Sequence, residues 1–497
     1  MGFPSVYQLN ARICLQEIGQ ALGRPATLDE IPDTLVEELV RRGFSWLWLL
    51  GVWQTGELGR QVAREDLELR TELARELPDV RSEDIVGSPF AVWSYQVHRD
   101  FGGDRALERL RRRLARQGIL LILDFVPNHI AVDHPWVFDH PEFLIHGREQ
   151  DLADVPQNYV RVETRLGPAI VAHGRDPNFP GWRDTVQLNY RHAGLRQAQT
   201  AALSSLAQQC DGLRCDMAML LQPEIIARTW GDAATPVDGS PPEDAPFWPA
   251  AIAAVRHHHP DFLFVAEVYW GMEWTLQQQG FDFTYDKRLY DRLRAGVAGP
   301  VRQHLQATPA FLGRGVHFLE NHDEERAAAV FEPARHRAAA VTVLMAAGMR
   351  LVHEGQIDGR RVKVSMVLGR RIAEAVDPSL RSFYERLLSV LARSEAHRGY
   401  WRLWPCAPAQ EGDPTFEQFI VSTWEEGDRR LLVVVNYAPS PGRAVAALAL
   451  PGLSGRRWRL MDLMGATARD VEGEAMVAGL TFDLEAWAYQ VLSIAPA

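Results

Sequence analysis

Four carboxylate side chains stand at the ends of short apolar runs, the positions where parallel strands would bring side chains together. They are Asp124 in DFVPNH, Asp216 in GLRCD, Glu267 in AEV and Asp323 in ENHD. Arg214 lies two positions before Asp216, so the two side chains share one face of an extended segment. Converging carboxylates repel one another and are costly to desolvate unless a cation or a reaction compensates. The set therefore predicts a catalytic pocket lined by carboxylates.

Other polar residues at these run ends are spaced so that they pair on one face. Because strand side chains alternate, Asp124 shares a face with Asn128, and Asn321 shares a face with Asp323. We expect each pair to converge on the same pocket as Asp216.

Alternating elements position these residues over about the first 390 residues. Short apolar runs of strand length alternate with longer helical patterns, which indicates repeated βα units and a parallel sheet. Eight runs predict an α/β fold, a (β/α)8 TIM barrel, whose active site lies at the carboxyl ends of its strands. The predicted strands are 6–13, 45–50, 119–126, 212–215, 262–268, 281–284, 316–321 and 350–353, and the predicted helices include 34–42, 105–117, 195–209, 249–258, 335–347 and 378–393.

Two connections are much longer than usual, and such loops commonly carry function. The first, 51–105, contains a charged stretch at 60–76 that we interpret as a solvated surface helix. The second, 130–190, contains a predicted hairpin at 159–173. Near the C-terminus the hydrophobic period changes to two, which indicates antiparallel strands. We therefore predict the catalytic barrel at 1–129 and 191–405, a small inserted domain at 130–190 after the third strand, and a C-terminal antiparallel β-sandwich domain at 406–497.

Composition excludes several classes of partner. The net charge of −11 is spread along 497 residues without a block of like charges, which argues against nucleic acid as a ligand. The first residues show no secretory signal, and no run of about 18 apolar residues offers a membrane span. The cysteines have neither disulfide-framework nor zinc spacing, so we expect reduced thiols in a cytoplasmic protein. They are Cys14, Cys210, Cys215 and Cys406.

The chain resembles the α-amylase family, glycoside hydrolase family 13, in four segments that follow the order of that family's signature segments. They are DFVPNH at 124–129, GLRCDMA at 212–218, AEVYW at 266–270 and FLENHD at 318–323. The resemblance extends to Tyr95, to DTVQLNY at 184–190 and to the C-terminal β domain, and so covers nearly the whole chain. It does not identify a subfamily.

The resemblance implies a role for each matching carboxylate. Asp216 would be the nucleophile of a retaining mechanism, Glu267 its general acid/base, and Asp323 a ligand of the ring hydroxyls of the distorted sugar. Such a mechanism needs two carboxyl groups about 5 to 5.5 Å apart. Arg214 would keep Asp216 ionised, while the neighbouring anion and burial would raise the pKa of Glu267.

The resemblance also implies residues that bind the sugar. His129 and His322 would donate hydrogen bonds to its hydroxyls, and Tyr95 would supply a stacking platform. Tryptophans in predicted loops could add further stacking faces. They are Trp53, Trp93, Trp136, Trp182, Trp270 and Trp274.

The chain departs from starch-cleaving family members just after the nucleophile. Those members commonly carry a Lys–His pair that contacts sugar and helps to frame a calcium ion, whereas this chain has Met219 and Leu220. Asn128, the usual calcium ligand of the first segment, is present. Calcium needs about six to eight oxygen ligands, so we expect no required cofactor, with Asn128 as the one candidate metal ligand.

Three functions share these segments. The first is a retaining hydrolase of α-glucosidic bonds in α-glucans or α-gluco-oligosaccharides. The second is a transglycosylase, glucanotransferase or trehalose-forming isomerase that passes the same intermediate to another acceptor. The third is an inactive barrel that serves as a binding subunit, against which the retention of Asp216, Glu267 and Asp323 argues. Linkage, substrate length, oligomeric state and pathway stay open.

Overall fold

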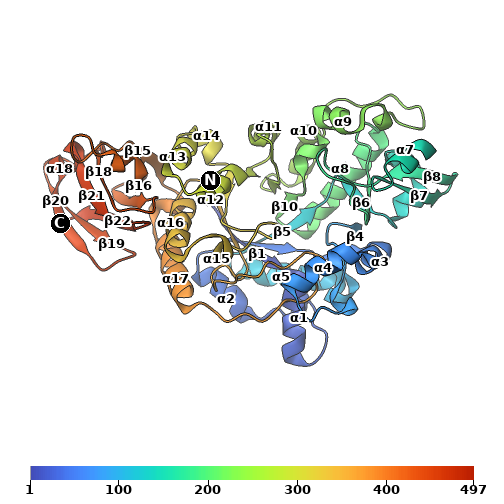
Figure 1. Cartoon of the computed structure of the whole chain (residues 1–497), viewed down its shortest axis with the longest axis horizontal. Helices are drawn as coiled ribbons and strands as arrows, with labels where there is room; N and C mark the ends of the chain where they lie inside the picture. Colours follow the sequence, from blue (N-terminus) through green and yellow to red (C-terminus); the bar gives the residue numbers. More distant parts are fainter. Residues whose placement is uncertain (1) are drawn as a thin grey trace.

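Eight parallel strands close into a barrel in a computed structural model that describes residues 2–497 (Figure 1). Each strand pairs with the next along the chain, and the last returns to the first. The predicted (β/α)8 barrel is therefore confirmed. Its strands are β1 (Ser5–Asn10), β2 (Trp46–Leu50), β5 (Leu120–Phe125), β10 (Gly212–Cys215), β11 (Leu263–Ala266), β12 (Phe283–Tyr285), β13 (Gly315–His317) and β14 (Met349–His353).

Amphipathic helices surround the barrel, and α5 (Gly103–Arg116) shows why they form. Leu107, Leu110 and Leu114 are buried at helical spacing, while arginines occupy the opposite face. Within the described residues, no helix is both long and apolar enough to cross a membrane. The predicted helices appear as α2 (Asp33–Arg41), α5, α8 (Ala193–Gln209), α10 (Trp248–His258), α16 (Pro333–Leu344) and α17 (Pro378–Arg393), and shorter unpredicted ones as α9 (Pro223–Trp230), α11 (Glu273–Gln278), α12 (Lys287–Ala295), α13 (Ala298–Leu305), α14 (Pro309–Leu312) and α15 (Ala327–Val330).

The first strand is shorter than the predicted 6–13, because Asn10 ends it. Helix α1 (Ala11–Leu22) follows directly and projects from the barrel at the bottom of Figure 1. The Asn10 side chain accepts hydrogen bonds from the backbone N–H groups of Arg12 (3.0 Å) and Ile13 (3.3 Å). These two N–H groups belong to the first turn of α1, where they have no partner within the helix. The Asn10 side chain supplies that partner and so stabilises the start of the helix at this point.

The first long connection contains two helices where we predicted one solvated helix at 60–76. A hairpin of β3 (Trp53–Thr55) and β4 (Val92–Val97) flanks α3 (Glu57–Glu65) and α4 (Leu67–Glu76). Asp66 separates the helices, and its carboxylate caps α4 by accepting from the Leu69 N–H at 3.0 Å. The expectation of a purely solvated helix was wrong, because Leu73 is buried and Leu69 lines a cavity described below.

The second long connection forms the lobe that carries β7 and β8, at the far right of Figure 1. The predicted hairpin at 159–173 is confirmed as β7 (Tyr159–Thr164) paired with β8 (Gly167–Ala172). The lobe begins and ends on one antiparallel pair, β6 (His129–Ala131) with β9 (Thr185–Gln187). It also holds two short helices, α6 (Pro135–Asp139) and α7 (Glu149–Asp154).

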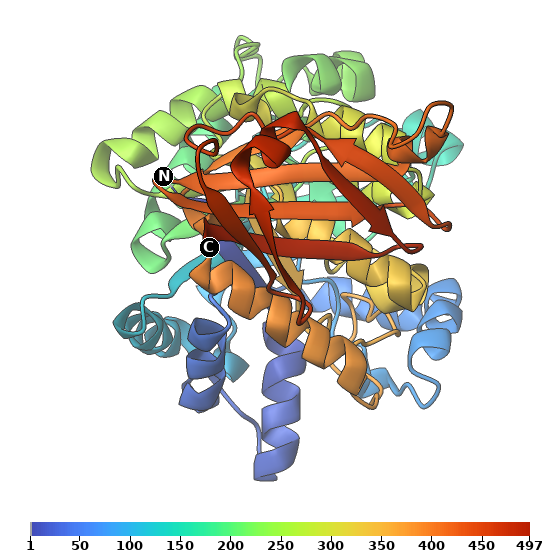
Figure 2. The same cartoon turned by 90° about the vertical axis from the view of Figure 1, so that its left-hand side faces the viewer.

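The C-terminal region is antiparallel, as its period of two predicted, and its larger sheet faces the viewer in Figure 2. That sheet begins before residue 406, because β15 pairs with β16. The six-stranded sheet has the order β15 (Tyr400–Trp404), β16 (Phe419–Glu426), β17 (Arg429–Asn436), β22 (Tyr489–Pro496), β19 (Arg457–Asp462), β20 (Ala468–Glu472), and the second pair is β18 (Gly442–Ala446) with β21 (Leu480–Leu484); α18 (Gly473–Ala478) lies between β20 and β21.

Candidate active site

A cavity of about 740 Å³ opens where several barrel strands end. Asp216 follows β10 directly and Glu267 follows β11 directly, and both line the cavity. Asp323 and His129 line it as well. The inserted segments complete the wall, since Val62, Ala63 and Leu69 come from α3 and α4 and Trp182, Arg183, Asp184 and Thr185 come from the second connection.

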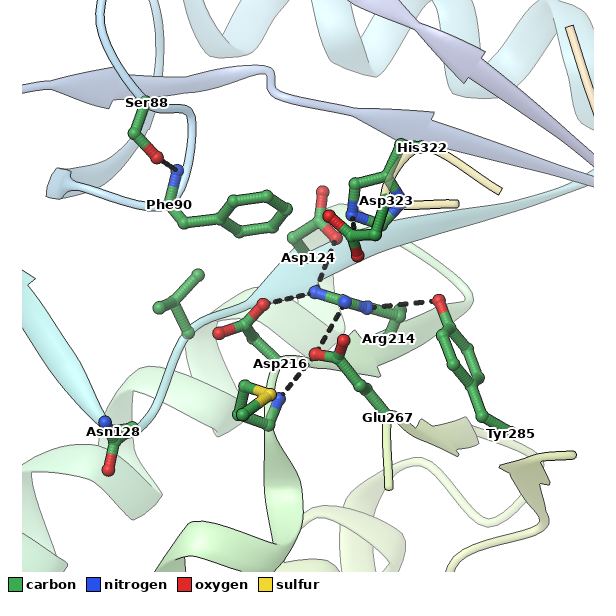
Figure 3. Close-up of polar contacts among 12 residues, drawn as sticks. Ser88, Phe90, Asp124, Asn128, Arg214, Asp216, Glu267, Tyr285, His322 and Asp323 are labelled. Atoms are coloured by element: carbon green, nitrogen blue, oxygen red, sulfur yellow. Dashed lines mark hydrogen bonds and ion pairs between the residues drawn. The ribbon is translucent and has the colours of Figure 1, made fainter. Parts of the chain in front are cut away.

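Arg214 lies beneath the cavity and contacts three carboxylates at once (Figure 3). Its side chain is 1% exposed. One terminal nitrogen, Nη1, is 2.5 Å from Asp216 Oδ1 and 3.8 Å from Asp124 Oδ1, and the other, Nη2, is 2.7 Å from Glu267 Oε2. A single buried cation therefore holds the two carboxylates expected to do the chemistry, and charge-assisted bonds of this kind fix position as well as charge.

The protonation of Glu267 is set by its surroundings. Burial, followed by the anions Asp216 and Asp323, raises the pKa of Glu267 to about 8, although Arg214 acts in the opposite direction. The expected rise in this pKa is thus present. At neutral pH, most of the Glu267 carboxyl groups carry a proton that they can donate.

The hydrogen bonds of Glu267 decide which oxygen carries that proton. Oε2 accepts from Arg214 and from the Met217 backbone N–H at 2.7 Å, whereas Oε1 contacts the Tyr269 hydroxyl at 2.9 Å. Because N–H groups can only donate, the proton of the neutral acid must lie on Oε1. Met217, whose N–H donates to Oε2, has a left-handed backbone conformation with φ 42°, which costs energy in a residue with a side chain.

Asp124 is the third carboxylate that contacts Arg214. Its carboxylate accepts from Trp48 Nε1 at 3.2 Å and from the Gly51 N–H at 3.4 Å. Burial raises the pKa of Asp124 to about 7, with Arg214 opposing and Asp216 adding to the rise. Asp124 does not line the cavity, so it contacts the site through Arg214.

Asp323 reaches the cavity by a turn and not by a strand. We predicted a strand at 316–321, but β13 ends at His317. The Asn321 side chain accepts from the backbone N–H groups of Asp323 (2.9 Å) and Glu324 (3.0 Å), which turns the chain. The expectation that Asn321 converges on the pocket with Asp323 was wrong, because its amide oxygen holds this turn.

His322 is buried behind Asp323 and does not line the cavity. The Gln8 side-chain amide contacts His322 Nδ1 at 2.7 Å. Nε2 is 3.1 Å from Asp323 Oδ2. Burial lowers the pKa of His322 to about 4, and the ring is neutral at neutral pH. His322 therefore packs against Asp323 without a hydrogen bond and does not reach the cavity, whereas we expected it to donate to a sugar.

Tyr95 does not line the cavity, whereas Phe90, Phe179, Trp182 and Tyr269 do. The Tyr95 hydroxyl donates to the Val126 carbonyl and accepts from its N–H, at 3.1 and 2.9 Å. The Tyr95 ring packs against Trp53 and Phe125. The structure therefore does not place Tyr95 where a stacking platform was expected. Phe90 lies in the same long connection, directly after Ser88 and Pro89. Its position in that connection is the only feature of the sequence that could have indicated a place in the cavity wall.

Two further aromatic contacts shape the wall. The Phe90 ring is 5.3 Å from the Arg214 guanidinium and 5.5 Å from the His322 ring. Trp182, one of the loop tryptophans singled out above, lies 4.9 Å from His129. Phe90 and Trp182 thus add apolar surface beside the carboxylates, as sugar-binding cavities require.

Comparisons with known proteins identify the fold. No protein-family model matches the sequence. An alpha-amylase of Haloarcula japonica is 25% identical over 306 residues, which cover 59% of this chain and 39% of that protein. An alpha-1,4-glucan:maltose-1-phosphate maltosyltransferase of Burkholderia pseudomallei is 25% identical over 241 residues, 45% of this chain and 18% of that protein. The chain thus spans well under half the length of either relative.

The solved structure of a maltogenic alpha-amylase from Thermotoga neapolitana superposes with a TM-score of 0.69 at 17% identity, covering 99% of this chain and 98% of that one. The chain has the α-amylase fold. The resemblance indicated by its four segments is therefore confirmed, and the subfamily is not defined by these similarities.

Within this α-amylase fold, Asn128 lies apart from the carboxylates around Arg214 (Figure 3). The Gln187 amide nitrogen donates to Asn128 Oδ1 and to the Asn128 carbonyl, both at 3.0 Å, and to the Leu188 carbonyl at 3.1 Å. The expectation that Asn128 pairs with Asp124 at the pocket was wrong, because Asn128 is held by the β9 strand.

The surroundings of Asn128 do not fit a calcium ion. Its amide oxygen is taken by Gln187, and residues 2–497 contain no group of three or more His, Cys, Asp or Glu side chains arranged to hold a metal. Calcium prefers several carboxylate and carbonyl oxygens that are free to converge. Met219 and Leu220, which replace the Lys–His pair, are both buried.

Proposed function

We propose that this protein is an enzyme that cleaves α-glucosidic bonds in α-glucans or α-gluco-oligosaccharides with retention of configuration. One observation carries the proposal: Asp216 and Glu267 are held by the two terminal nitrogens of the same buried arginine, in one cavity. The α-amylase fold and the alpha-amylase relative support the substrate class. Membership of the α-amylase family is part of the same proposal.

In the first step, Asp216 attacks the anomeric carbon while Glu267 protonates the departing glycosidic oxygen. The bond between that carbon and the leaving oxygen breaks, a bond to the Asp216 carboxylate forms, and the proton moves from Glu267 Oε1 to the leaving group. Asp323 accepts hydrogen bonds from ring hydroxyls, and the turn made by Asn321 holds Asp323 in position.

In the second step, Glu267, now ionised, takes a proton from water, and the water oxygen attacks the anomeric carbon from the other face. The bond to Asp216 breaks and its carboxylate returns to Arg214. Two inversions restore the α configuration. The second step needs an ionised Glu267, which the contacts with Arg214 and the Met217 N–H stabilise.

A second candidate function is transfer of the same intermediate to a sugar hydroxyl or to phosphate. The Burkholderia relative, named as a maltosyltransferase, favours this candidate. Water and another acceptor compete for one covalent intermediate, so the carboxylates serve either reaction.

Product analysis by proton NMR tests the proposal. Cleavage of a maltooligosaccharide should release the α anomer first, before mutarotation, and a fluorinated glucoside should label Asp216 covalently. Initial release of the β anomer would overturn the retaining mechanism. Products longer than the substrate would identify a transferase, and shorter products alone would identify a hydrolase.

A further inference from the structure

A second cavity, of about 590 Å³, lies between α1 and the first long connection. Within the described residues, it shares no lining side chain with the catalytic cavity. Helix α1 supplies one wall, through Arg12, Gln16 and Gln20, and β3 supplies Gln54 and Thr55. Nothing in the proposed reaction uses this space.

The residue of this cavity that carries the argument is Arg12, a buried cation that has no carboxylate partner among the residues that the structure describes. Its side chain is 8% exposed. The guanidinium donates to the Gly87 carbonyl at 2.5 Å and to Thr55 Oγ1 at 3.3 Å, which uses two of its five N–H groups. Burial lowers the pKa of Arg12 to about 10, and the neighbouring cation Arg60 lowers this pKa further.

The other buried arginines fall into two groups. Arg214 and Arg326 contact carboxylates. Among the described residues, Arg350 and Arg430 have hydrogen bonds to backbone carbonyls only, and neither lines this cavity. A buried charge is costly unless it is paired. Arg12 lines a cavity large enough to admit a partner, so an anion there would compensate a charge that the protein leaves unpaired.

The remaining lining residues favour a ligand whose uncharged part carries hydroxyl groups, and they disfavour a ligand with a second negative charge. His98 Nδ1 accepts from the Asp100 N–H at 3.2 Å, which leaves the proton on Nε2 as a donor. Glutamine side chains at 16, 20 and 54 add amide donors and acceptors. The lining carboxylates already contact arginines other than Arg12, so they discourage a highly charged ligand; they are Glu57, Glu83, Asp84 and Asp100.

We propose that this cavity is a second ligand site, in which Arg12 binds the single anionic group of a small polyhydroxylated molecule, such as a phosphorylated sugar. The hydroxyl groups of the ligand would contact His98 and the glutamines. The site adjoins the catalytic wall, because the Gly87 carbonyl that Arg12 holds belongs to the segment that leads to Phe90.

Calorimetric titration of the full chain with four probes tests the anionic group. The probes are glucose 6-phosphate, gluconate, inorganic phosphate and glucose. Glucose 6-phosphate should bind at least about tenfold more tightly than glucose, which lacks the anion. Tighter binding of gluconate would identify a carboxylate as the preferred anion. Equal binding of glucose 6-phosphate and inorganic phosphate would overturn the polyhydroxylated body, and no binding of any anionic probe would overturn the site.

Two variants place the binding in this cavity. Arg12→Gln removes the charge, and Gln20→Trp fills the cavity from an exposed position of α1 without altering Arg12. Each should weaken glucose 6-phosphate binding at least about tenfold. Arg109→Gln, which loses only an exposed pair with Asp29, should bind like the parent protein. Unchanged binding in Gln20→Trp would overturn the proposal even if Arg12→Gln failed to fold.

Discussion

At the scale of single residues, Arg214 organises the candidate active site. Its Nη1 contacts both Asp216 and Asp124, and its Nη2 contacts Glu267. Three carboxylates around one buried cation cannot all be ionised without leaving net negative charge in a site shielded from water. Burial and the neighbouring anion Asp216 accordingly raise the pKa values of Glu267 and Asp124. Of the three carboxylates, Asp216 has the shortest contact with Arg214.

Replacing Asp216 by Asn should abolish turnover and leave the fold intact. The change keeps the side-chain volume but removes the attacking carboxylate, so kcat should fall by at least about 10³-fold. Steady-state kinetics on a maltooligosaccharide, together with a melting curve, would measure both effects. Asp232→Asn, an exposed carboxylate change, is the matched control. Near-normal turnover in Asp216→Asn would show that another group forms the intermediate.

The raised pKa of Glu267 predicts the alkaline limit of activity. A group with a raised pKa keeps its proton up to that pKa, so kcat/KM should hold at neutral pH and fall as the pH rises through about 8. Glu267→Gln should remove that limb and slow natural glucosides most, while sparing the first step on fluoride or aryl glucosides, whose leaving groups need no proton. Equal losses on both substrate types would contradict the acid/base role.

At the scale of elements, the β6–β9 pair joins the inserted lobe to the barrel. Gln187, the last residue of β9, is buried and donates to three oxygens of Asn128 and Leu188. A bound cation could also contact oxygens from two segments at once, but here the side-chain amide of Gln187 does so. Protein hydrogen bonds therefore join the lobe to the barrel at this junction.

Removing this amide should therefore destabilise the protein more than a chelator does. Gln187→Ala leaves buried oxygens without donors and should cost about 1–3 kcal/mol of unfolding free energy. Gln150→Ala, an exposed glutamine of the same lobe, should cost almost nothing. Denaturant unfolding of both variants, with and without EDTA, measures the difference. A large loss of stability in EDTA that calcium restores would show that the lobe binds a metal.

At the scale of the whole molecule, the C-terminal sheet and the barrel share a hydrophobic core. Ile420, Trp424 and Leu431 belong to the same buried cluster as the barrel strands. Trp424 is fully buried, and its indole N–H donates to the Met345 carbonyl at the end of α16 at 2.8 Å. The other face of the sheet has a core of its own. The sheet therefore covers barrel surface that would otherwise meet water.

This shared core predicts one cooperative unfolding transition. Scanning calorimetry should show a single peak, and Trp424→Ala should lower the whole peak, at a cost of about 3–5 kcal/mol. Tyr400→Ala, at a half-exposed position of neighbouring β15, is the control and should change the peak little. Two separate peaks, of which Trp424→Ala moves only one, would show that the two parts unfold independently.

The sequence by itself determined the features that depend on local pattern. Eight apolar runs specified the barrel, and the residues that follow two of them, Asp216 and Glu267, came out beside one another because parallel strands end at one mouth. Arg214 was placed on the face of Asp216 by strand alternation alone, and the structure has the two in contact. Patterns of this kind are local, so they can be read along the chain.

Only the tertiary structure decided the features that depend on contacts between distant segments. The Tyr95 hydroxyl bonds to the Val126 backbone, and Tyr95 does not line the cavity. The Gln187 amide donates to the Asn128 side-chain oxygen. Helices α3 and α4 contribute residues to the cavity wall. Strand alternation failed for Asn128 and Asn321 because both lie beyond the last paired residue, where turns and side-chain hydrogen bonds set direction. The partners of Tyr95 and Asn128 lie far apart from them in sequence, and no local period encodes which segments meet; the turn at Asn321 is local but has no strand period.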